Sequence, residues 1–367
     1  MTPGDRVVLI PGFFGFGAFG EKPSERIEYF DDVVAALSAA ARIPAAHVHV
    51  HEPPPTGALT ARVESLFETV LRVLGEASLS GRRRPAPKVH LVGHSTGGVD
   101  ARLLANERFA WPEMDARLRR EVLPRIGTVV TLSAPLHGTP IARRLRGPFL
   151  LLLDGLSVWS ILDRRLDWKL VPGASVESLL RLLRLRPAAS RLLVRLLGGR
   201  DRQAAEIDRF RGALIADGRL MDDLVPESMR KLNRRIAGGD RRPLRHYVTV
   251  APRPQVGLDA IDRRTAYATC YCATESARFA PRAFPAGTWV VGGPKPSLGE
   301  APRANDGVVP ASSQALDPRH PSRIVLGDHL DVVGHFEGKR NTTIFKCGAS
   351  FGRREFAALW TDIARAL

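Results

Sequence analysis

The chain has 367 residues, 44% of them hydrophobic, so it can bury a sizeable core, and global disorder is excluded. Its formal net charge is +16, nearly all basic residues are arginine, and alanine, glycine and proline are also abundant. GC-rich codons explain this composition better than a nucleic-acid or membrane partner does, and the basic stretches lack the interleaved aromatic residues of a single-strand platform. We expect no nucleic-acid partner, while peripheral contact with an anionic lipid surface stays open.

Three cysteines, Cys270, Cys272 and Cys347, are too few and too unevenly spaced for a disulfide scaffold or a zinc site. No basic segment with a long apolar stretch and a cleavage site precedes the first expected strand, and the leucine-rich runs are too short or too broken by arginine to span a bilayer. As it stands, the sequence predicts a soluble, cytoplasmic protein, or a secreted one if a leader has been removed.

Strand and helix patterns alternate over the first 140 residues. Short β-branched runs predict strands at Arg6–Ile10, His47–His51, Lys88–Val92 and Ile126–Leu132. Apolar residues at helical spacing predict helices at Tyr29–Ala41, Gly57–Leu74 and Gly97–Asn106. This alternation indicates a mostly parallel central sheet with helices on both faces, an α/β fold.

The alternation stops between residues 141 and 242, where no strand pattern occurs. Val176–Leu185 and Arg191–Leu197 have the spacing of amphipathic helices with an arginine edge. Strand patterns then resume at His246–Ala251, Thr288–Val291 and Arg323–Leu326, and Phe351–Leu367 closes the chain as a helix. We therefore expect a core made of residues 1–140 and 243–367, interrupted by a helical insertion over 141–242 that acts as a movable lid or as a fixed cap.

Residues 93–98, G-H-S-T-G-G, follow a predicted strand and precede a predicted helix. This is the strand–turn–helix setting of the G-x-S-x-G nucleophile elbow of α/β-hydrolases. Small residues let strand and helix approach closely, and the turn holds the Ser95 hydroxyl out at the end of the sheet. A serine needs a base, an orienting acid and oxyanion donors, and this fold places acid and base after the serine in chain order.

The candidate acid is Asp306, in the segment N-D-G-V-V-P at 305–310, although an Asp-Gly pair by itself is typical of a plain turn. The candidate base is His329, which lies three residues past the last predicted strand and is favoured over His335, nine residues past it. Ser95, Asp306 and His329 would then form the catalytic set.

The oxyanion hole needs two backbone N–H donors. Thr96, directly after the nucleophile, would supply one, and Phe13, in the glycine-rich loop P-G-F-F-G-F-G at 11–17, would supply the other. Aromatic residues of this region, Phe13, Phe14, Phe16 and Phe19, line the substrate site or simply fill the core. Alternating histidines at 47, 49 and 51 are conceivable metal ligands, but with no carboxylate pattern nearby an ordinary strand is the preferred interpretation.

Taken together, these motifs resemble those of bacterial triacylglycerol lipases of the α/β-hydrolase superfamily. The matching segments are V-L-I-P-G-F-F-G-F (8–16), Y-F-D-D-V-V-A-A-L (29–37), V-H-L-V-G-H-S-T-G-G-V-D-A-R (89–102), V-T-L-S-A-P-L-H-G-T-P (130–140), L-V-P-E-S-M-R-K-L-N (224–233), N-D-G-V-V-P (305–310) and D-H-L-D (328–331). The resemblance implies Ser95 as nucleophile, Asp306 as acid, His329 as base, and Phe13 and Thr96 as oxyanion donors.

The chain departs from these relatives in two places. It has Pro11-Gly12 where they usually have His-Gly, which leaves a backbone donor intact but changes the loop. Many of them hold a structural calcium through two aspartates; Asp331 matches one, and no aspartate lies between 263 and 305 to match the other. We therefore expect no metal or cofactor, with calcium as the open alternative.

The sequence thus predicts a serine carboxylic-ester hydrolase, most consistent with a lipase acting on acylglycerols or similar lipid esters. One alternative is a non-lipid esterase, thioesterase or polyester depolymerase. Another, from a different class, is a catalytically idle membrane- or protein-binding module on a hydrolase scaffold.

Overall fold

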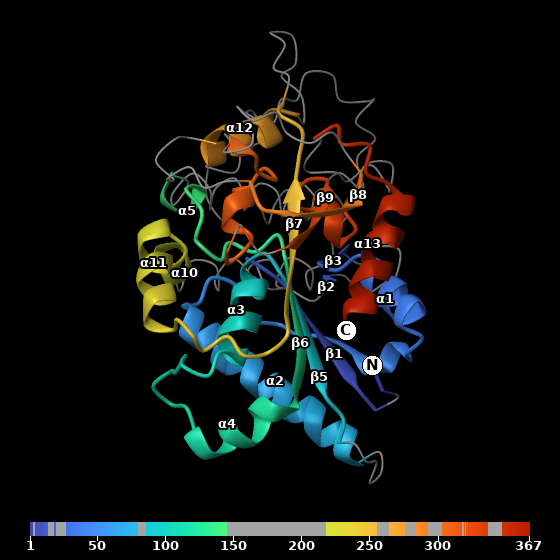
Figure 1. Cartoon of the computed structure of the whole chain (residues 1–367), viewed down its shortest axis with the longest axis vertical. Helices are drawn as coiled ribbons and strands as arrows, with labels where there is room; N and C mark the ends of the chain where they lie inside the picture. The colour runs from blue at the N-terminus through green and yellow to red at the C-terminus, as the bar shows by residue number, and fades with distance from the viewer. Residues whose placement is uncertain are drawn as a thin grey trace, which may run out of the picture.

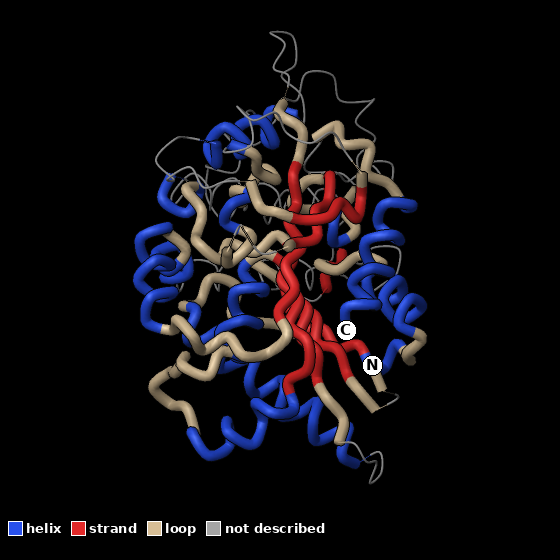
Figure 2. Tube along the Cα trace, viewed as in Figure 1, coloured by secondary structure: helices blue, strands red, loops and turns tan. Residues whose placement is uncertain are grey.

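The computed structural model describes residues 1–2, 4–13, 18–19, 27–79, 86–144, 218–254, 264–275, 284–292, 303–317, 319, 321–336 and 347–367. A seven-stranded sheet with the order β4-β1-β5-β6-β7-β9-β8 forms its centre, and every pairing in it is parallel (Figure 2). The strands are β1 (Arg6–Ile10), β4 (Val48–Val50), β5 (Val89–His94), β6 (Ile126–Leu132), β7 (Leu244–Val250), β8 (Gly287–Val291) and β9 (Ser322–Leu326). A separate antiparallel pair joins β2 (Ala18–Phe19) to β3 (Ile27–Glu28).

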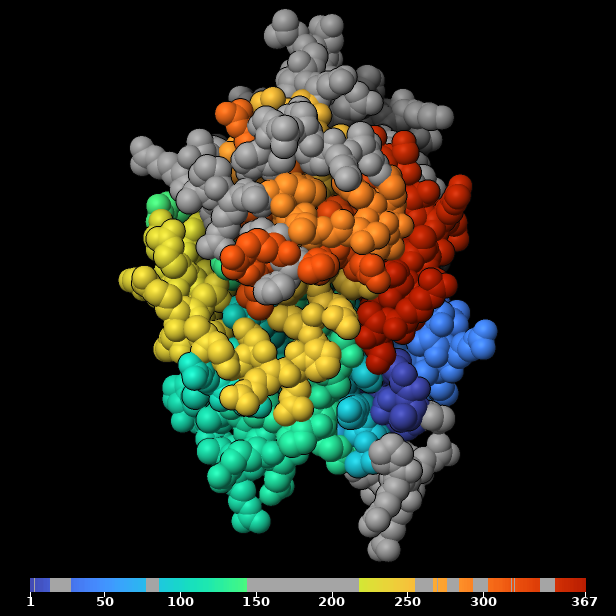
Figure 3. Space-filling model, viewed as in Figure 1, coloured from blue at the N-terminus to red at the C-terminus, as the bar shows by residue number. Residues whose placement is uncertain are grey.

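Helices cover both faces of this sheet, as the alternation of the sequence predicts (Figure 1). On one side lie α2 (Leu59–Leu79) and α3 (Thr96–Ala105), and on the other lie α1 (Val33–Ala41) and α13 (Arg353–Ala366). In Figure 3, the red surface of α13 adjoins the blue surface of α1. A mostly parallel sheet buried on both faces is therefore confirmed.

The side chains of β1 show how the strands separate two cores. Val8 and Ile10 point into the core that contains α2 and α3, whereas Val7 and Leu9 point into the core that contains α1 and α13, and all four are fully buried. Successive side chains of a strand point to opposite faces, so a continuous apolar run is what a strand between two helical layers requires.

Three helices differ from the sequence expectation. The helix expected from Tyr29 begins only at Val33, because Asp32 takes a left-handed conformation with φ of 59° and interrupts the helical backbone. The sequence pattern does not predict helix α12 (Arg264–Glu275), which contains threonine, tyrosine and cysteine, residues of lower helix propensity than alanine or leucine. Its buried residues nevertheless recur at helical spacing, at Tyr267, Cys270, Tyr271 and Thr274. A short helix α4 (Ala116–Val122) was also missed.

Only the two ends of the expected insertion fall within the described residues, and both are helical: α5 (Ile141–Arg144), then α10 (Arg219–Asp223) and α11 (Pro226–Arg235). Leu220, Met221 and Met229 join the core around α2 and α3. The two leucine-rich helices expected at 176–185 and 191–197 lie outside the described residues, so the lid or cap stays a prediction. In the described part of the chain, none of the helices is long and apolar enough to cross a bilayer.

Candidate active site

The turn between β5 and α3 holds Ser95 in a strained backbone conformation. Its φ of 54° and ψ of −129° lie outside the regions that non-glycine residues prefer. The turn stays this tight because Gly97 has no side chain: a Cβ there would lie 2.1 Å from the carbonyl oxygen of Ile10. The Ser95 side chain therefore projects from the carboxyl end of a central strand, and the N-terminus of α3 lies directly behind it.

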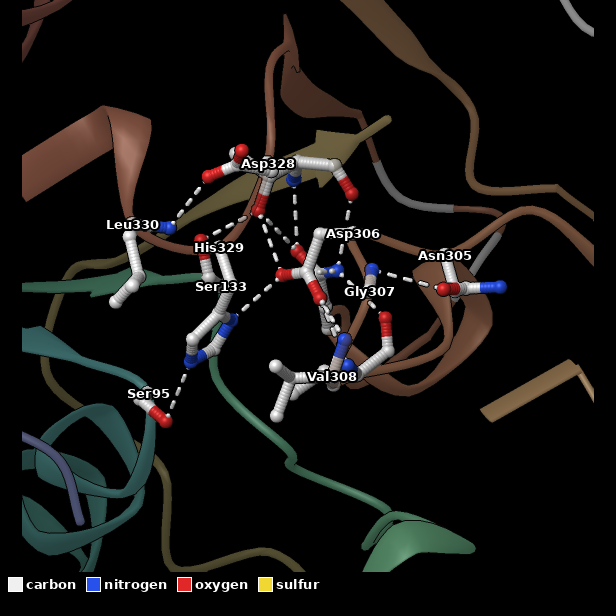
Figure 4. A network of polar contacts seen from close by, with 12 residues as sticks. Ser95, Ser133, Asn305, Asp306, Gly307, Val308, Asp328, His329 and Leu330 are labelled. Atoms are coloured by element: carbon white, nitrogen blue, oxygen red, sulfur yellow. Dashed lines mark hydrogen bonds and ion pairs between the residues drawn. The ribbon is translucent and has the colours of Figure 1, made fainter. Parts of the chain in front are cut away.

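Ser95, His329 and Asp306 form one hydrogen-bonded series (Figure 4). The Oγ of Ser95 lies 2.9 Å from Nε2 of His329, and Nδ1 of His329 lies 2.8 Å from Oδ2 of Asp306. Asp306 is fully buried and the other two side chains are nearly so. Because a buried carboxylate at Nδ1 favours the proton on that nitrogen, Nε2 faces the serine as a proton acceptor.

His329 follows β9 in a short loop that its neighbour Asp328 shapes. Oδ1 of Asp328 accepts the backbone N–H groups of Leu330 and Asp331, each at 2.9 Å. The backbone N–H of His329 donates to the carbonyl oxygen of Asp306 at 3.0 Å, which connects the loop that carries His329 to the loop that carries Asp306. His335 lies elsewhere, with Nε2 3.1 Å from the carbonyl oxygen of Tyr29.

Asp306 accepts hydrogen bonds from five donors. Oδ1 accepts the backbone N–H groups of Val308 at 2.9 Å and Val309 at 2.7 Å. Oδ2, the oxygen facing His329, also accepts from the Thr249 hydroxyl at 3.1 Å and from Nε2 of Gln314 at 3.3 Å. These donors fix the plane of the carboxyl group. Sequence reasoning missed Thr249 and Gln314, since neither belongs to a motif.

The glycine-rich loop after β1 lies directly against Ser95. A Cβ added to Gly12 would lie 2.5 Å from Cβ of Ser95 and 3.0 Å from its Oγ. The Gly12–Phe13 peptide therefore lies close to the Ser95 side chain, and Thr96, the other candidate donor, follows Ser95 as the first residue of α3. The roles of Phe13 and Thr96 as oxyanion donors stay a prediction. The Phe13 side chain packs against the core around α2 and α3.

A buried ion pair holds the backbone of the loop that contains Pro11 and Gly12. Nη2 of Arg62 lies 2.7 Å from Oδ2 of Asp100, and both side chains are fully buried. The same nitrogen donates to the carbonyl oxygens of Pro11 at 3.1 Å and Gly12 at 3.3 Å. In a planar trans peptide the N–H points opposite the C=O, so a bond to the Gly12 oxygen also sets the direction of the Phe13 N–H. Sequence reasoning assigned no role to this pair.

Solved structures of similar fold cover nearly the whole chain. Lipase 1 from Pelosinus fermentans matches with a TM-score of 0.52 and 16% identity, over 99% of this chain and 98% of its own. EstA from Clostridium botulinum matches with a TM-score of 0.52 and 18% identity, over 99% and 88%. The Staphylococcus hyicus lipase matches with a TM-score of 0.50 and 14% identity, over 99% and 94%. The fold is that of the α/β-hydrolases. No protein-family model and no curated protein matches the sequence.

The described part of the chain offers one group of side chains that resembles a metal site. Among the described residues, that group is Asp328, Asp331 and Cys347, whose ligand atoms lie within 4.8 Å of one another. Calcium requires six to eight oxygen ligands. Here Oδ2 of Asp331 accepts the N–H of Asp328 at 2.8 Å and the Cys347 thiol at 3.6 Å. Burial raises the pKa of that thiol, so it keeps its proton. This donor set does not fit a calcium ion.

Among the described residues, the alternating histidines at 47, 49 and 51 do not form a metal site. His47 lies in a 3-10 turn rather than in β4, and His51 bonds Thr69 through Nδ1 at 2.9 Å. Burial lowers the pKa of His51 to about 3. Among the described residues, these histidines form no group of three metal ligands. Phe14 and Phe16, which the sequence left open as lining of the substrate site or as ordinary core, lie outside the described residues.

Proposed function

We propose that this chain is a serine hydrolase that cleaves carboxylic esters, with Ser95 as the nucleophile. The supporting observation is the series from Ser95 through His329 to Asp306, which begins at a strained turn on the end of a central strand. A plain structural serine needs neither a base at 2.9 Å nor a backbone conformation that costs free energy.

In the proposed reaction, Nε2 of His329 takes the hydroxyl proton as Oγ of Ser95 attacks the ester carbonyl carbon. The new C–O bond turns the carbonyl oxygen into an oxyanion, which accepts hydrogen bonds from the Thr96 and Phe13 N–H groups. The tetrahedral intermediate then expels the alcohol, which receives the proton from His329. Water, activated by the same histidine, releases the acid from the acyl-enzyme, while Asp306 remains ionised and orients the ring.

As substrate we propose lipid-like esters such as acylglycerols. Similar solved structures are described as lipases and as carboxyl esterases, which favours ester chemistry but does not select a chain length. The proposed helical insertion, with its apolar faces and arginine edge, would suit an acyl chain or an anionic lipid surface. A non-lipid esterase, a thioesterase or a polyester depolymerase would use the same chemistry on another substrate.

The test is hydrolysis of p-nitrophenyl esters from acetate to palmitate by the wild-type chain and by Ser95→Ala. We expect turnover that requires Ser95, is greatest for long acyl chains and rises further above the solubility limit of the substrate. A maximum at short chains would replace the lipase with an esterase. Absence of turnover at every chain length would refute the ester-hydrolase proposal and favour a binding module.

A further inference from the structure

Two buried side chains connect the oxyanion loop to the loop of the base. The backbone N–H of Gly12 donates to the Tyr29 hydroxyl at 2.9 Å, and that hydroxyl lies 2.6 Å from Nδ1 of His94. On the far side of the same ring, Nε2 of His94 lies 2.9 Å from the carbonyl oxygen of His329. Tyr29 and His94 are 8% and 1% exposed, so water does not compete for these bonds.

The donors and acceptors of this series allow one arrangement of protons. The Tyr29 oxygen accepts the Gly12 N–H, so its own proton is directed to Nδ1 of His94. Nδ1 is then the acceptor, and the ring proton sits on Nε2, where it donates to the His329 carbonyl. Burial, together with the neighbouring His329, lowers the pKa of His94 far below its usual value, so the ring stays neutral. Burial likewise raises the pKa of the Tyr29 hydroxyl.

We propose that Tyr29 and His94 are positioning residues that hold the oxyanion donor and the base at fixed places on either side of Ser95. The inference rests on the proposed ester hydrolysis, because the positions of the donor and the base matter only if a reaction takes place at Ser95. The polar atoms of the two side chains bond backbone groups rather than the reacting side chains of Ser95, His329 and Asp306. Each bonds a backbone group of a reacting loop, and His94 sits next to Ser95 in the chain.

The arrangement explains why two loops that are 317 positions apart, at Gly12 and His329, can be set relative to each other. The rings of His94 and His329 pack with their centroids 4.7 Å apart, which limits movement of the base as well as of its backbone. A shift of about 1 Å in a reacting group can lower a rate by about a hundredfold. Loss of the series should therefore act on the rate and leave the fold intact.

The experiment compares Tyr29→Phe, His94→Leu, His94→Gln and the double variant Tyr29→Phe/His94→Leu with wild type. Matched controls are Tyr247→Phe, a buried tyrosine whose hydroxyl bonds Asp362 at 2.8 Å, and His90→Gln, on the same strand as His94. A p-nitrophenyl phosphonate counts active sites by the p-nitrophenol released, and its reaction rate reports on Ser95 without requiring the right ester. Ester turnover is then expressed per active site.

We expect Tyr29→Phe and His94→Leu to keep the active-site count of wild type and to lose about tenfold to hundredfold in phosphonylation rate and in kcat, with KM little changed. His94→Gln should recover part of the loss, because its amide can still donate to the His329 carbonyl. The double variant should react no more than about threefold more slowly than the slower of the two single variants, because both changes break the same series of hydrogen bonds. The controls should react like wild type.

The proposal is overturned if Tyr29→Phe and His94→Leu react at the wild-type rate per site. It is equally overturned if the lower activity of these variants is explained by a smaller number of active sites. The same holds if the rate losses of the two single variants multiply in the double variant. A wild-type chain that reacts with the phosphonate but hydrolyses no ester would refute the proposed ester substrate, and the rate comparison would still decide the roles of Tyr29 and His94.

Discussion

Replacing Asp306 by asparagine tests how its surroundings select the proton position on His329. Oδ1 accepts two backbone N–H groups, whereas Oδ2 faces the histidine ring, a threonine hydroxyl and a glutamine amide. An asparagine has one carbonyl oxygen, and backbone donors cannot rotate away. We therefore expect that oxygen at the Oδ1 position and the amide NH₂ at the Oδ2 position.

With an NH₂ group opposite Nδ1, the ring must carry its proton on Nε2, where it faces Ser95. It can then no longer accept the serine proton, and a loss of about 10⁴-fold in kcat is expected, which corresponds to about 5 kcal/mol of transition-state stabilisation. The fold should lose only about 1–2 kcal/mol of stability, the cost of one or two mismatched buried hydrogen bonds.

The assay is turnover of a p-nitrophenyl ester at neutral pH, together with urea unfolding of each variant. Asp328→Asn is the matched control, because that carboxylate is also buried and next to the base, yet its Oδ1 accepts backbone N–H groups that an amide oxygen also accepts. The control should keep most of its activity. If Asp306→Asn loses less than about tenfold, or if both variants lose equally, the tautomer argument is wrong.

Three further outcomes are expected. Gly12→Ala should abolish turnover and lower the unfolding free energy by about 1–3 kcal/mol, because its Cβ would lie 2.5 Å from that of Ser95; retained turnover would contradict the loop placement. Asp100→Leu should lower the unfolding free energy measured in urea by about 3–5 kcal/mol by leaving the buried Arg62 charge unpaired, and a loss below 1 kcal/mol would argue against it. Burial raises the pKa of Asp328 from 3.8 to about 6, so the stability it adds below pH 3.8 is lost as pH rises to about 6. Wild type should accordingly lose stability relative to Asp328→Asn over that interval, whereas a constant difference in urea unfolding would refute this.

The segment around Ser95 shows most clearly what can be predicted from the sequence alone. A sharp strand–turn–helix connection needs small residues at fixed neighbouring positions, so residues 93–98 identify both the turn and Ser95. The strands can also be predicted, because a strand buried on both faces is rich in apolar and β-branched residues; residues 7–10 of β1 are all apolar, and β6 combines isoleucine, valine and leucine with two threonines. Fold order then indicates Asp306 and His329, and the structure brings both into hydrogen-bonding reach of the serine series.

The residues that surround Ser95, His329 and Asp306 could not be predicted from a sequence pattern. Thr249 and Gln314 meet Asp306 from β7 and from the turn after residue 310, and Arg62 and Asp100 meet beneath the oxyanion loop from two different helices. Each is a single polar residue, so it creates no spacing that a pattern could reveal. Only the buried position of its side chain, seen once the helices pack on the sheet, shows that it must have a partner.

The sequence by itself therefore determined the parallel sheet, the helical layers and the choice of Ser95, Asp306 and His329 as candidate site residues, since each depends on periodicity, on neighbouring positions or on the order of motifs along the chain. Only the tertiary structure decided which donors surround Asp306, what supports the Gly12–Phe13 peptide and how Tyr29 and His94 join two distant loops. Those contacts join residues up to 235 positions apart, and a hydrogen bond between such residues depends on the path of the whole chain.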